Sequence, residues 1–217
     1  MAKAAPSLPN HLAVGYERFR RGRYLMERER YRELGEGGQR PPTMIIACSD
    51  SRSGPEVVFD AAPGELFVVR NVAALVPVYA PDQRAHGASA ALEFAVLALG
   101  VTSIVVMGHG RCGGISAALT AFDPLSATDF IGTWVEPVRA LIPSRVAQAG
   151  DDPAAQALAL ERASVANSIS NLRTFPWIRT REDSGDLQIS GVWFDIGLGE
   201  LHALAPSGWT LVGVGTR

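Results

Sequence analysis

The chain has very little cysteine: Cys48 and Cys112 are the only two among its 217 residues. Two cysteines cannot build the disulfide framework that stabilises small secreted proteins. Charge of either sign is also not in excess, since 20 Lys and Arg stand against 22 Asp and Glu, for a formal net charge of −2. This balance gives no support to a nucleic acid or an anionic membrane as a partner, and we expect neither.

Long hydrophobic runs are missing as well. The longest apolar stretch, at about 88–99, is too short to span a bilayer and contains Glu93. The opening residues, MAKAAPS, have no apolar region of the kind found in secretory signals. Hydrophobic residues still make up 47% of the chain, which is enough for a substantial core. We therefore expect one cytoplasmic domain over residues 1–217, with cysteines that are free, metal-bound or catalytic.

Apolar runs alternate with helical patterns, and this alternation predicts the fold class. The runs at 43–47, 65–69 and 103–107 lack polar alternation, as is typical of parallel strands covered on both faces. Between and after them, helical spacing predicts helices, which are expected at 86–99, 133–142 and from Asp152 to a stop at Pro176. The last runs, at 187–195, 200–204 and 209–212, are separated by Gly-rich turns and predict an antiparallel meander. The fold class expected is α/β, with a mostly parallel central sheet flanked by helices and antiparallel C-terminal edge strands.

The first 40 residues differ from the rest and are expected to form an N-terminal helical arm beside an α/β core at 43–217. Leu12, Tyr16 and Phe19 recur at helical spacing, and Gly22 is expected to break the helix before a second one at 25–34. Such thin apolar stripes make weak helices on their own. We expect the arm to lie across another surface, such as a second subunit, and residues 1–10 to be disordered.

A glycine-rich turn after the strand at 103–107 carries metal-binding side chains. Its sequence is Gly108-His109-Gly110-Arg111-Cys112-Gly113-Gly114. Cys48 ends another predicted strand, and the carboxyl ends of parallel strands are where open α/β sheets place their sites. Thiolate and imidazole are zinc ligands, and three protein ligands with one open position are typical of catalytic zinc. The pattern predicts one Zn²⁺ per chain, held by Cys48, His109 and Cys112.

Two other interpretations of these residues are open. Each cysteine can be a small buried hydrophobic residue. The glycines also match the dinucleotide fingerprint G-x-G-x-x-G between a strand and a helix, which would cradle a pyrophosphate. In that interpretation Asp129 has roughly the expected spacing, but it does not end an evident second strand. The His and Cys between the glycines are also left without a role.

Asp50 and Arg52 follow Cys48 by two and four residues. A carboxylate beside zinc can occupy the fourth ligand position, or it can accept a hydrogen bond from zinc-bound water. An arginine that grips the carboxylate with two parallel hydrogen bonds favours the second role. The plainer interpretation is a helix cap and a surface ion pair, which would contribute little to stability.

These segments together resemble a β-class carbonic anhydrase: Cys48-Ser49-Asp50-Ser51-Arg52, Pro63-Gly64-Glu65, Arg70-Asn71-Val72-Ala73 and Gly108-His109-x-x-Cys112-Gly113-Gly114. The resemblance runs from about Gly15 to about Leu211. It implies that Cys48, His109 and Cys112 bind the zinc and that Asp50 and Arg52 are the catalytic dyad. The implied reaction is the reversible hydration of carbon dioxide to bicarbonate and a proton. Zinc-bound hydroxide attacks the carbon dioxide, oriented by the Asp–Arg dyad.

The resemblance also implies a substrate pocket and partners. The pocket residues would be Gln39, Phe67, Val72 and Gly113, with Phe94 where one branch of the family has a tyrosine. Gln39 favours the branch with an open zinc–water site. Members form dimers or tetramers with active sites at the subunit interface. Carbon dioxide and bicarbonate would be the substrates. Independently of the resemblance, His86 stands at a predicted helix start and is either a proton shuttle or a capping or surface histidine. Hydrolysis of carbon disulfide or carbonyl sulfide, and a non-catalytic zinc-stabilised binding protein, are the alternatives.

Overall fold

The computed structural model describes residues 8–120 and 124–213. The chain divides into two compact units, residues 1–39 and residues 40–217. Residues 1–7 of the segment expected to be disordered lie outside the described residues. The expectation is wrong for Asn10, which already begins a helix.

The N-terminal unit consists of three helices: α1 (Asn10–Arg21), α2 (Arg23–Met26) and α3 (Arg28–Gly37). The predicted break at Gly22 is confirmed, since its backbone (φ −116°, ψ −100°) is not helical. The Phe19 ring packs 5.7 Å from Tyr24 and 5.9 Å from Tyr31, measured between ring centroids. Tyr16, from the same predicted stripe, is 60% exposed. Within this unit, therefore, only part of the apolar stripe packs against other side chains.

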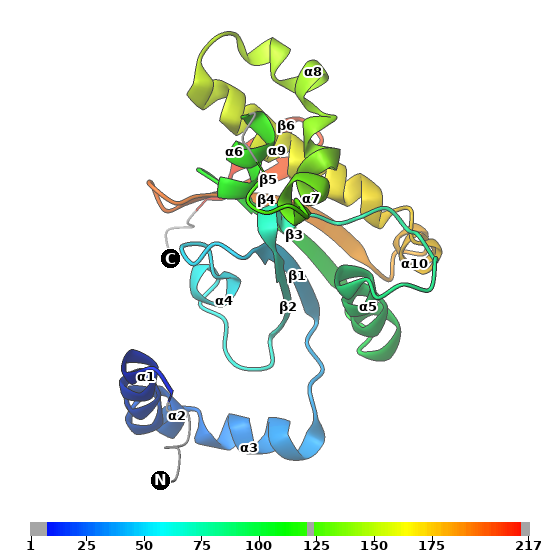
Figure 1. Ribbon diagram of the computed structural model, residues 1–217. Coiled ribbons are helices and arrows are strands. Elements are labelled where there is room, and N and C mark those ends of the chain that lie inside the picture. Colours follow the sequence, from blue (N-terminus) through cyan, green and yellow to red (C-terminus); the bar gives the residue numbers. More distant parts are fainter. Residues whose placement is uncertain (1–7, 121–123, 214–217) are drawn as a thin grey trace. The chain divides into compact units, whose positions relative to one another are not determined.

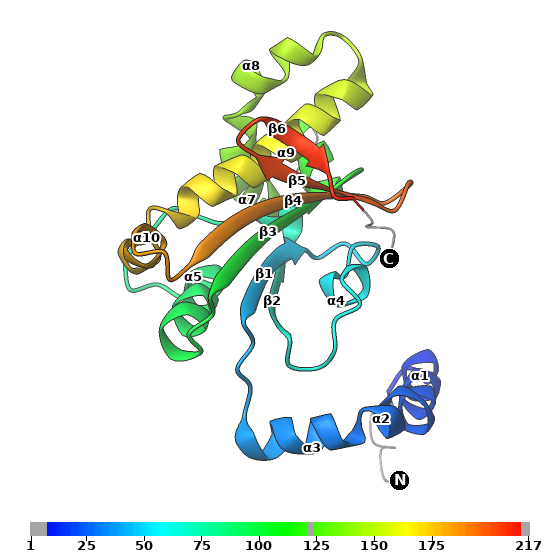
Figure 2. The same ribbon diagram turned by 180° about the vertical axis from the view of Figure 1, so that it is seen from behind.

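The second unit is built on a six-stranded sheet in the order β2-β1-β3-β4-β5-β6 (Figures 1 and 2). The strands are β1 (Thr43–Cys48), β2 (Leu66–Asn71), β3 (Ser103–His109), β4 (Gln188–Asp195), β5 (Glu200–Ala205) and β6 (Gly208–Leu211). The strands β1 to β4 are parallel to one another, whereas β5 is antiparallel to β4 and β6 is antiparallel to β5. The α/β class with a mostly parallel sheet and antiparallel edge strands is confirmed. The expected antiparallel meander is formed by β4, β5 and β6, and β4 joins it to the parallel part of the sheet by pairing with β3.

Helices cover both faces of the sheet. They are α4 (Pro55–Val58), η1 (Val72–Ala74), α5 (Gly87–Glu93), η2 (Phe94–Ala98), α6 (Gly113–Leu119), α7 (Phe130–Arg139), α8 (Ile142–Arg145), η3 (Ala147–Ala149), α9 (Pro153–Leu172) and α10 (Pro176–Asp183). None of the helices in the described ranges is long and apolar enough to cross a bilayer.

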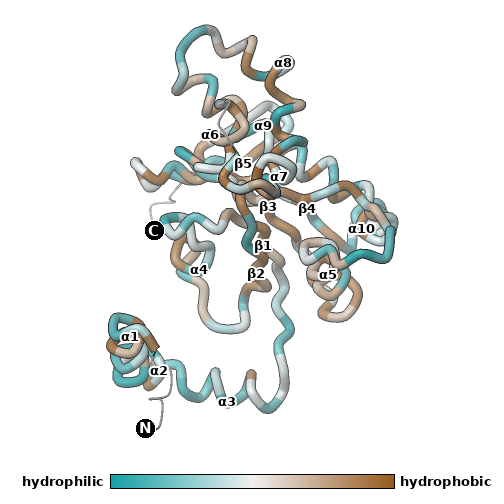
Figure 3. Tube along the Cα trace, viewed as in Figure 1, coloured by the Kyte–Doolittle hydropathy of each residue, from teal (hydrophilic) through white to brown (hydrophobic). Residues whose placement is uncertain are grey.

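The longest helix, α9, begins as its sequence predicts. The Asp152 side chain accepts a hydrogen bond from the Ala154 N–H, and Pro153 occupies the first turn, where its missing N–H costs nothing. The expectation at the other end is incomplete, because Pro176 begins the short helix α10 instead of only ending α9. Brown apolar segments of the sheet and of α9 meet in the interior (Figure 3). There Val165 and Leu172 belong to the same buried cluster as Ile104 of β3.

The helix expected at 86–99 is not buried all round, so that prediction is wrong. It divides into α5 and the π-helical η2, and it ends at Gly100 with φ of +70°. Leu92 and Val96 are buried, whereas Phe94 and Leu97 are 50% and 56% exposed. The run is apolar on its outer face as well, so its composition does not show which face meets the core.

Candidate metal centre

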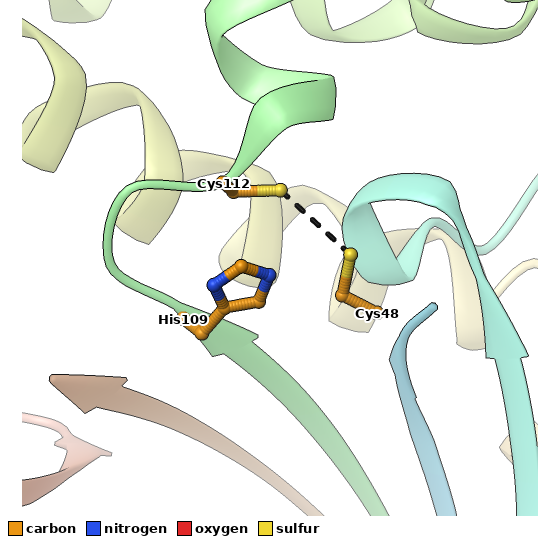
Figure 4. Close-up of side chains that lie close together, drawn as sticks. All are labelled: Cys48, His109 and Cys112. Carbon is orange, nitrogen blue, oxygen red and sulfur yellow. Dashed lines mark hydrogen bonds between the residues drawn. The ribbon is translucent and has the colours of Figure 1, made fainter. Parts of the chain in front are cut away.

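Cys48, His109 and Cys112 come together at the carboxyl edge of the sheet (Figure 4). Cys48 is the last residue of β1, His109 is the last of the neighbouring β3, and Cys112 immediately precedes α6. Their ligand atoms all lie within 4.8 Å of one another, and the two Sγ atoms are 3.8 Å apart. All three residues are at least nine-tenths buried. The predicted convergence is thus present in the fold.

The donor atoms fit a zinc ion. The His109 Nδ1–H donates to the Gly110 carbonyl oxygen over 2.9 Å, which leaves the Nε2 lone pair free. Nε2 is buried and has no hydrogen-bond partner among the described residues. It belongs to a set of two sulfurs and one imidazole nitrogen, the ligand types that zinc prefers. These residues also line a cavity of about 10 Å³.

The contact between the two thiols makes Cys48 more acidic. The pKa of the Cys48 thiol is lowered to about 4, because the Cys112 thiol hydrogen-bonds to its sulfur and outweighs the effect of burial. His109 acts in the same direction. Zinc binds the thiolate form of cysteine. The fold therefore already favours a thiolate at one of the ligand positions.

The glycines of the turn have packing roles. A Cβ at Gly108 would lie 2.6 Å from Val165 Cγ2 of α9, and one at Gly110 would lie 3.0 Å from the Trp193 ring. These two glycines of the dinucleotide fingerprint thus let a helix and an indole approach the strand end. A Cβ at Gly113 would meet nothing within 4 Å. Close packing therefore explains Gly108 and Gly110 without a pyrophosphate, whereas it does not explain Gly113.

Glu161 of α9 is a buried residue beneath the cluster that sequence reasoning missed. Its Oε1 accepts a hydrogen bond from the Cys112 N–H (3.2 Å), and its Oε2 accepts one from the Trp193 Nε1–H (3.0 Å). Burial raises the pKa of this carboxyl, while its hydrogen bonds oppose the rise. No motif in the sequence marks it, and the structure shows it on the same buried face of α9 as Leu160 and Val165.

Asp50 and Arg52 form a two-point ion pair beside the cluster. Arg52 Nε donates to Asp50 Oδ1 over 2.9 Å, and Nη2 donates to Oδ2 over 2.7 Å. The Arg52 guanidinium holds the pKa of the Asp50 carboxyl well below its usual range. The Asp50 side chain is 16% exposed, and its Oδ2 lies 4.0 Å from His109 Nε2. The carboxylate therefore adjoins the metal ligands and is held by a cation.

Arg70 is a second cation that the sequence reasoning did not assign to this edge. Its Nε donates to the Cys48 carbonyl over 2.8 Å, and its Nη2 donates to the Asp50 carbonyl over 2.5 Å. Arg52 Nη2 also donates to the carbonyl of Arg111, in the glycine-rich turn, over 3.2 Å. The loop after β1 is thereby tied to both β2 and the turn after β3.

Of the predicted pocket residues, Val72 and Gly113 lie next to the cluster. A Cβ on Gly114, two residues after Cys112, would lie 2.6 Å from Val72 Cγ1. The loop of Val72 is fixed by Asn71, whose side chain exchanges two hydrogen bonds with the Leu75 backbone. Val72 is 37% exposed, so an apolar side chain lies open beside the start of α6.

Phe67 and Phe94 lie elsewhere in the chain. Their ring centroids are 6.0 Å apart, and Phe67 pairs with Met44, four residues before Cys48 on β1. At about 3.3 Å per residue, that is roughly 13 Å along the sheet from the level of Cys48. Gln39 ends the N-terminal unit and is not placed relative to the site. The fold of the second unit therefore does not bring Phe67 and Phe94 to the cluster of the same chain.

The His86 side chain is paired rather than capping. Its Nε2 lies 2.7 Å from Asp82 Oδ1, and no side-chain cap closes the start of α5. The proton-shuttle interpretation of His86 stays a prediction.

Comparison with known proteins gives the site its context. A family model described as carbonic anhydrase matches residues 43–201. A carbonic anhydrase of Pseudomonas aeruginosa is 38% identical over 192 residues, covering 88% of this chain and 84% of the relative. The chain belongs to the β-class carbonic anhydrases. It is thus a member of a family of zinc enzymes, and the predicted family, enzyme class and cofactor are confirmed.

Solved β-carbonic anhydrases share its fold. The structure of the β-carbonic anhydrase CcaA has a TM-score of 0.85 and 28% identity, covering 96% of this chain and 92% of that chain. One from a study of two tetrameric β-carbonic anhydrases of the ascomycete Sordaria macrospora has a TM-score of 0.72 and 28% identity, covering 96% of this chain and 95% of that chain. The whole α/β unit that carries the cluster is thus similar to these enzymes.

Proposed function

We propose that this carbonic anhydrase hydrates carbon dioxide at the Cys48–His109–Cys112 centre, with Asp50 and Arg52 as its catalytic pair. The observation that carries the proposal is the position of the Asp50 carboxylate. It adjoins the ligand cluster, 4.0 Å from His109 Nε2, and is gripped by Arg52 at both oxygens. A purely structural metal site would not need a carboxylate fixed in this way.

Cys48, His109 and Cys112 would hold one zinc ion, which lowers the pKa of bound water and so supplies a nucleophile near neutral pH. The contribution of Asp50 is to orient that nucleophile. Its ionised carboxylate only accepts hydrogen bonds, so it fixes the direction in which the reacting water presents its proton. The lone pair of the water is then left free to face the substrate carbon.

Arg52 is a positioning residue for Asp50. A free carboxylate next to a metal would compete for the open position or repel a developing negative charge. The two Arg52 hydrogen bonds occupy both carboxylate oxygens and compensate their charge. Arg52 is in turn anchored on the Arg111 carbonyl. The pair thus keeps Asp50 beside the cluster without making it a ligand.

The apolar part of the pocket is assigned to two copies of the chain. Val72 and Gly113 border the cluster in the same chain. Phe67 and Phe94 lie far along the sheet, where the partly buried Phe67 ring contacts the half-exposed ring of Phe94. We place this pair, together with Gln39, over the cluster of a second copy in a dimer or tetramer. The tetrameric relatives of Sordaria macrospora agree with such an assembly.

Stopped-flow carbon dioxide hydration by zinc-analysed protein tests the proposal. The wild type is expected to be active with one zinc per chain. Arg52→Ala should keep the zinc and lose roughly 10–100-fold in kcat, the usual effect of removing a residue that orients the reacting groups. Arg52→Lys should not restore the rate, because lysine cannot donate in a fork.

Arg173→Ala is the matched control. Arg173 makes an equivalent two-point pair with Glu182, with both distances 2.8 Å, and neither residue belongs to the cluster. Its loss should leave kcat unchanged. Full turnover in Arg52→Ala would refute the role of the pair. A zinc-loaded wild type without activity would refute the enzymatic assignment itself.

A further inference from the structure

A pocket outside the metal centre lies between α9 and the C-terminal edge of the sheet. Figure 2 shows β5 and β6 beside α9, with α8 beyond them. The pocket has a volume of about 400 Å³. Most of its wall is apolar, formed by small alanines of α9, Leu204 of β5 and Trp209 of β6. The full lining is Arg145, Ala149, Ala159, Arg162, Ala163, Ala166, Leu204 and Trp209.

Arg162 contributes a cation that forms no ion pair in the described part of the chain, although the Glu161 carboxylate attracts it from further away. Its guanidinium carbon lies 4.9 Å from the Trp193 ring centroid and 5.4 Å from that of Trp209. Its Nε is buried and has no acceptor among the residues that the structure describes. Burial lowers the pKa of this guanidinium, yet an arginine stays protonated in proteins. A partly buried cation with an unused donor is costly unless a ligand accepts from it.

The other side chains that line the pocket supply no negative charge to Arg162. Arg145, at the end of α8, is a second cation in the wall, and the lining contains no acidic side chain. Neither arginine has an ion pair within the described part of the chain. Other arginines do find carboxylates, as Arg52 does in Asp50 and Arg173 in Glu182. Two positive charges in an otherwise apolar pocket are complementary to an anion with an apolar body.

We infer that this pocket binds a small monocarboxylate whose apolar body rests on the alanines, Leu204 and Trp209. The planar guanidinium of Arg162 matches a carboxylate, which it can engage through two donors. Arg145 lies at the same wall and adds attraction. Small-molecule sites are commonly apolar with a few placed polar groups, as here. The site does not depend on the metal or on the proposed reaction.

Calorimetric titration of the zinc-loaded protein with benzoate tests this inference, using matched variants. The wild type should bind one benzoate per chain at this pocket. In Arg162→Met this binding should be absent or at least about tenfold weaker, because the charge-assisted hydrogen bonds are lost. Methionine keeps an apolar stem against the two indoles. Benzoate that binds at the metal would be common to both proteins, so only the difference between them counts.

Arg179→Met is the control for charge. Arg179 is an exposed α10 residue whose ion pair with Asp183 is 3.8 Å long, and its loss should leave benzoate binding unchanged. Ala163→Leu keeps both arginines but fills the pocket, and it should also abolish this binding. That variant decides the matter if Arg162→Met fails to fold, as judged by circular dichroism.

Three results would overturn the inference. One is a wild type whose benzoate binding is equal to that of Arg162→Met. Another is an equal loss in Arg179→Met, which would mean unspecific charge attraction. The third is inorganic phosphate binding as tightly as benzoate, which would make this a general anion site and leave no role for the apolar wall.

Discussion

The buried carboxylate of Glu161 accepts a hydrogen bond from the backbone N–H of Cys112, one of the residues of the metal centre. Its other oxygen accepts from the Trp193 indole, so the carboxylate has two fixed partners. The glutamate thereby joins the long helix α9 to the residue that precedes α6. A group that is hydrogen-bonded to a metal-ligating residue usually determines how well that ligand is positioned.

Glu161→Gln should therefore weaken zinc binding by roughly 10–100-fold, as is usual for residues that orient metal ligands. The amide can accept from only one of the two N–H groups, which leaves the other without an acceptor. We expect the free energy of unfolding to fall by about 1–3 kcal/mol for this buried loss. Zinc competition with a chromophoric chelator and urea unfolding measure the two effects. Glu136→Gln, at a side chain that is 67% exposed, should change neither.

Metal removal is the second prediction. Chelation should lower Tm while the far-UV circular dichroism stays native, because the largest buried cluster of the sheet contains none of the three ligands. A ligand present at a thousandfold excess over its Kd stabilises by about 4 kcal/mol. For a chain of this length we therefore expect a fall in Tm of roughly 8–16 °C. Zinc should restore Tm in the wild type but not in His109→Ala. A Tm insensitive to chelator in zinc-analysed protein would contradict the site.

Close packing at Gly108 gives the third prediction. An alanine there would place its Cβ 2.6 Å from Val165 Cγ2, and such overpacking costs about 1–3 kcal/mol. The Gly108→Ala, Val165→Ala double variant should lose less free energy of unfolding than the two single variants lose together, because the shortened side chain at 165 makes room for the new methyl group. Gly113→Ala, with open space above it, should leave stability unchanged. Additive losses in urea unfolding would refute the contact.

Much of the metal centre could be predicted from the sequence pattern of single segments. Cys48 and His109 each end an apolar run, and parallel strands with a shared edge bring such ends together. Glu161 was not predicted, because a single glutamate in a helix does not show from sequence which face is buried. Arg70 was missed for a related reason: its partners are backbone carbonyls, which carry no sequence signal. Phe94 was predicted in a helix buried all round, whereas its outer face is apolar and exposed.

The half-exposed Phe94 gives the last prediction, which concerns two copies of the chain. If Phe94 of one copy covers the cluster of another, then Asp50→Asn and Phe94→Arg should complement each other. Each variant alone should be nearly inactive in carbon dioxide hydration. In a mixed dimer, one site has the intact Asp50 of one chain and the intact Phe94 of the other. Random pairing makes about half of the dimers mixed, so roughly a quarter of all sites should be active after co-expression.

The control for this experiment is a mixture of the two variants purified separately and assayed before their subunits exchange. That mixture should show only the sum of the two residual activities. Phe94 is 50% exposed, so the arginine is expected to leave the fold of the single chain intact, which circular dichroism checks. Were the pocket formed within one chain, every site in a mixed dimer would still carry one defect. Co-expression would then give no gain over the separate proteins, and the placement of Phe67 and Phe94 over a second copy would be wrong.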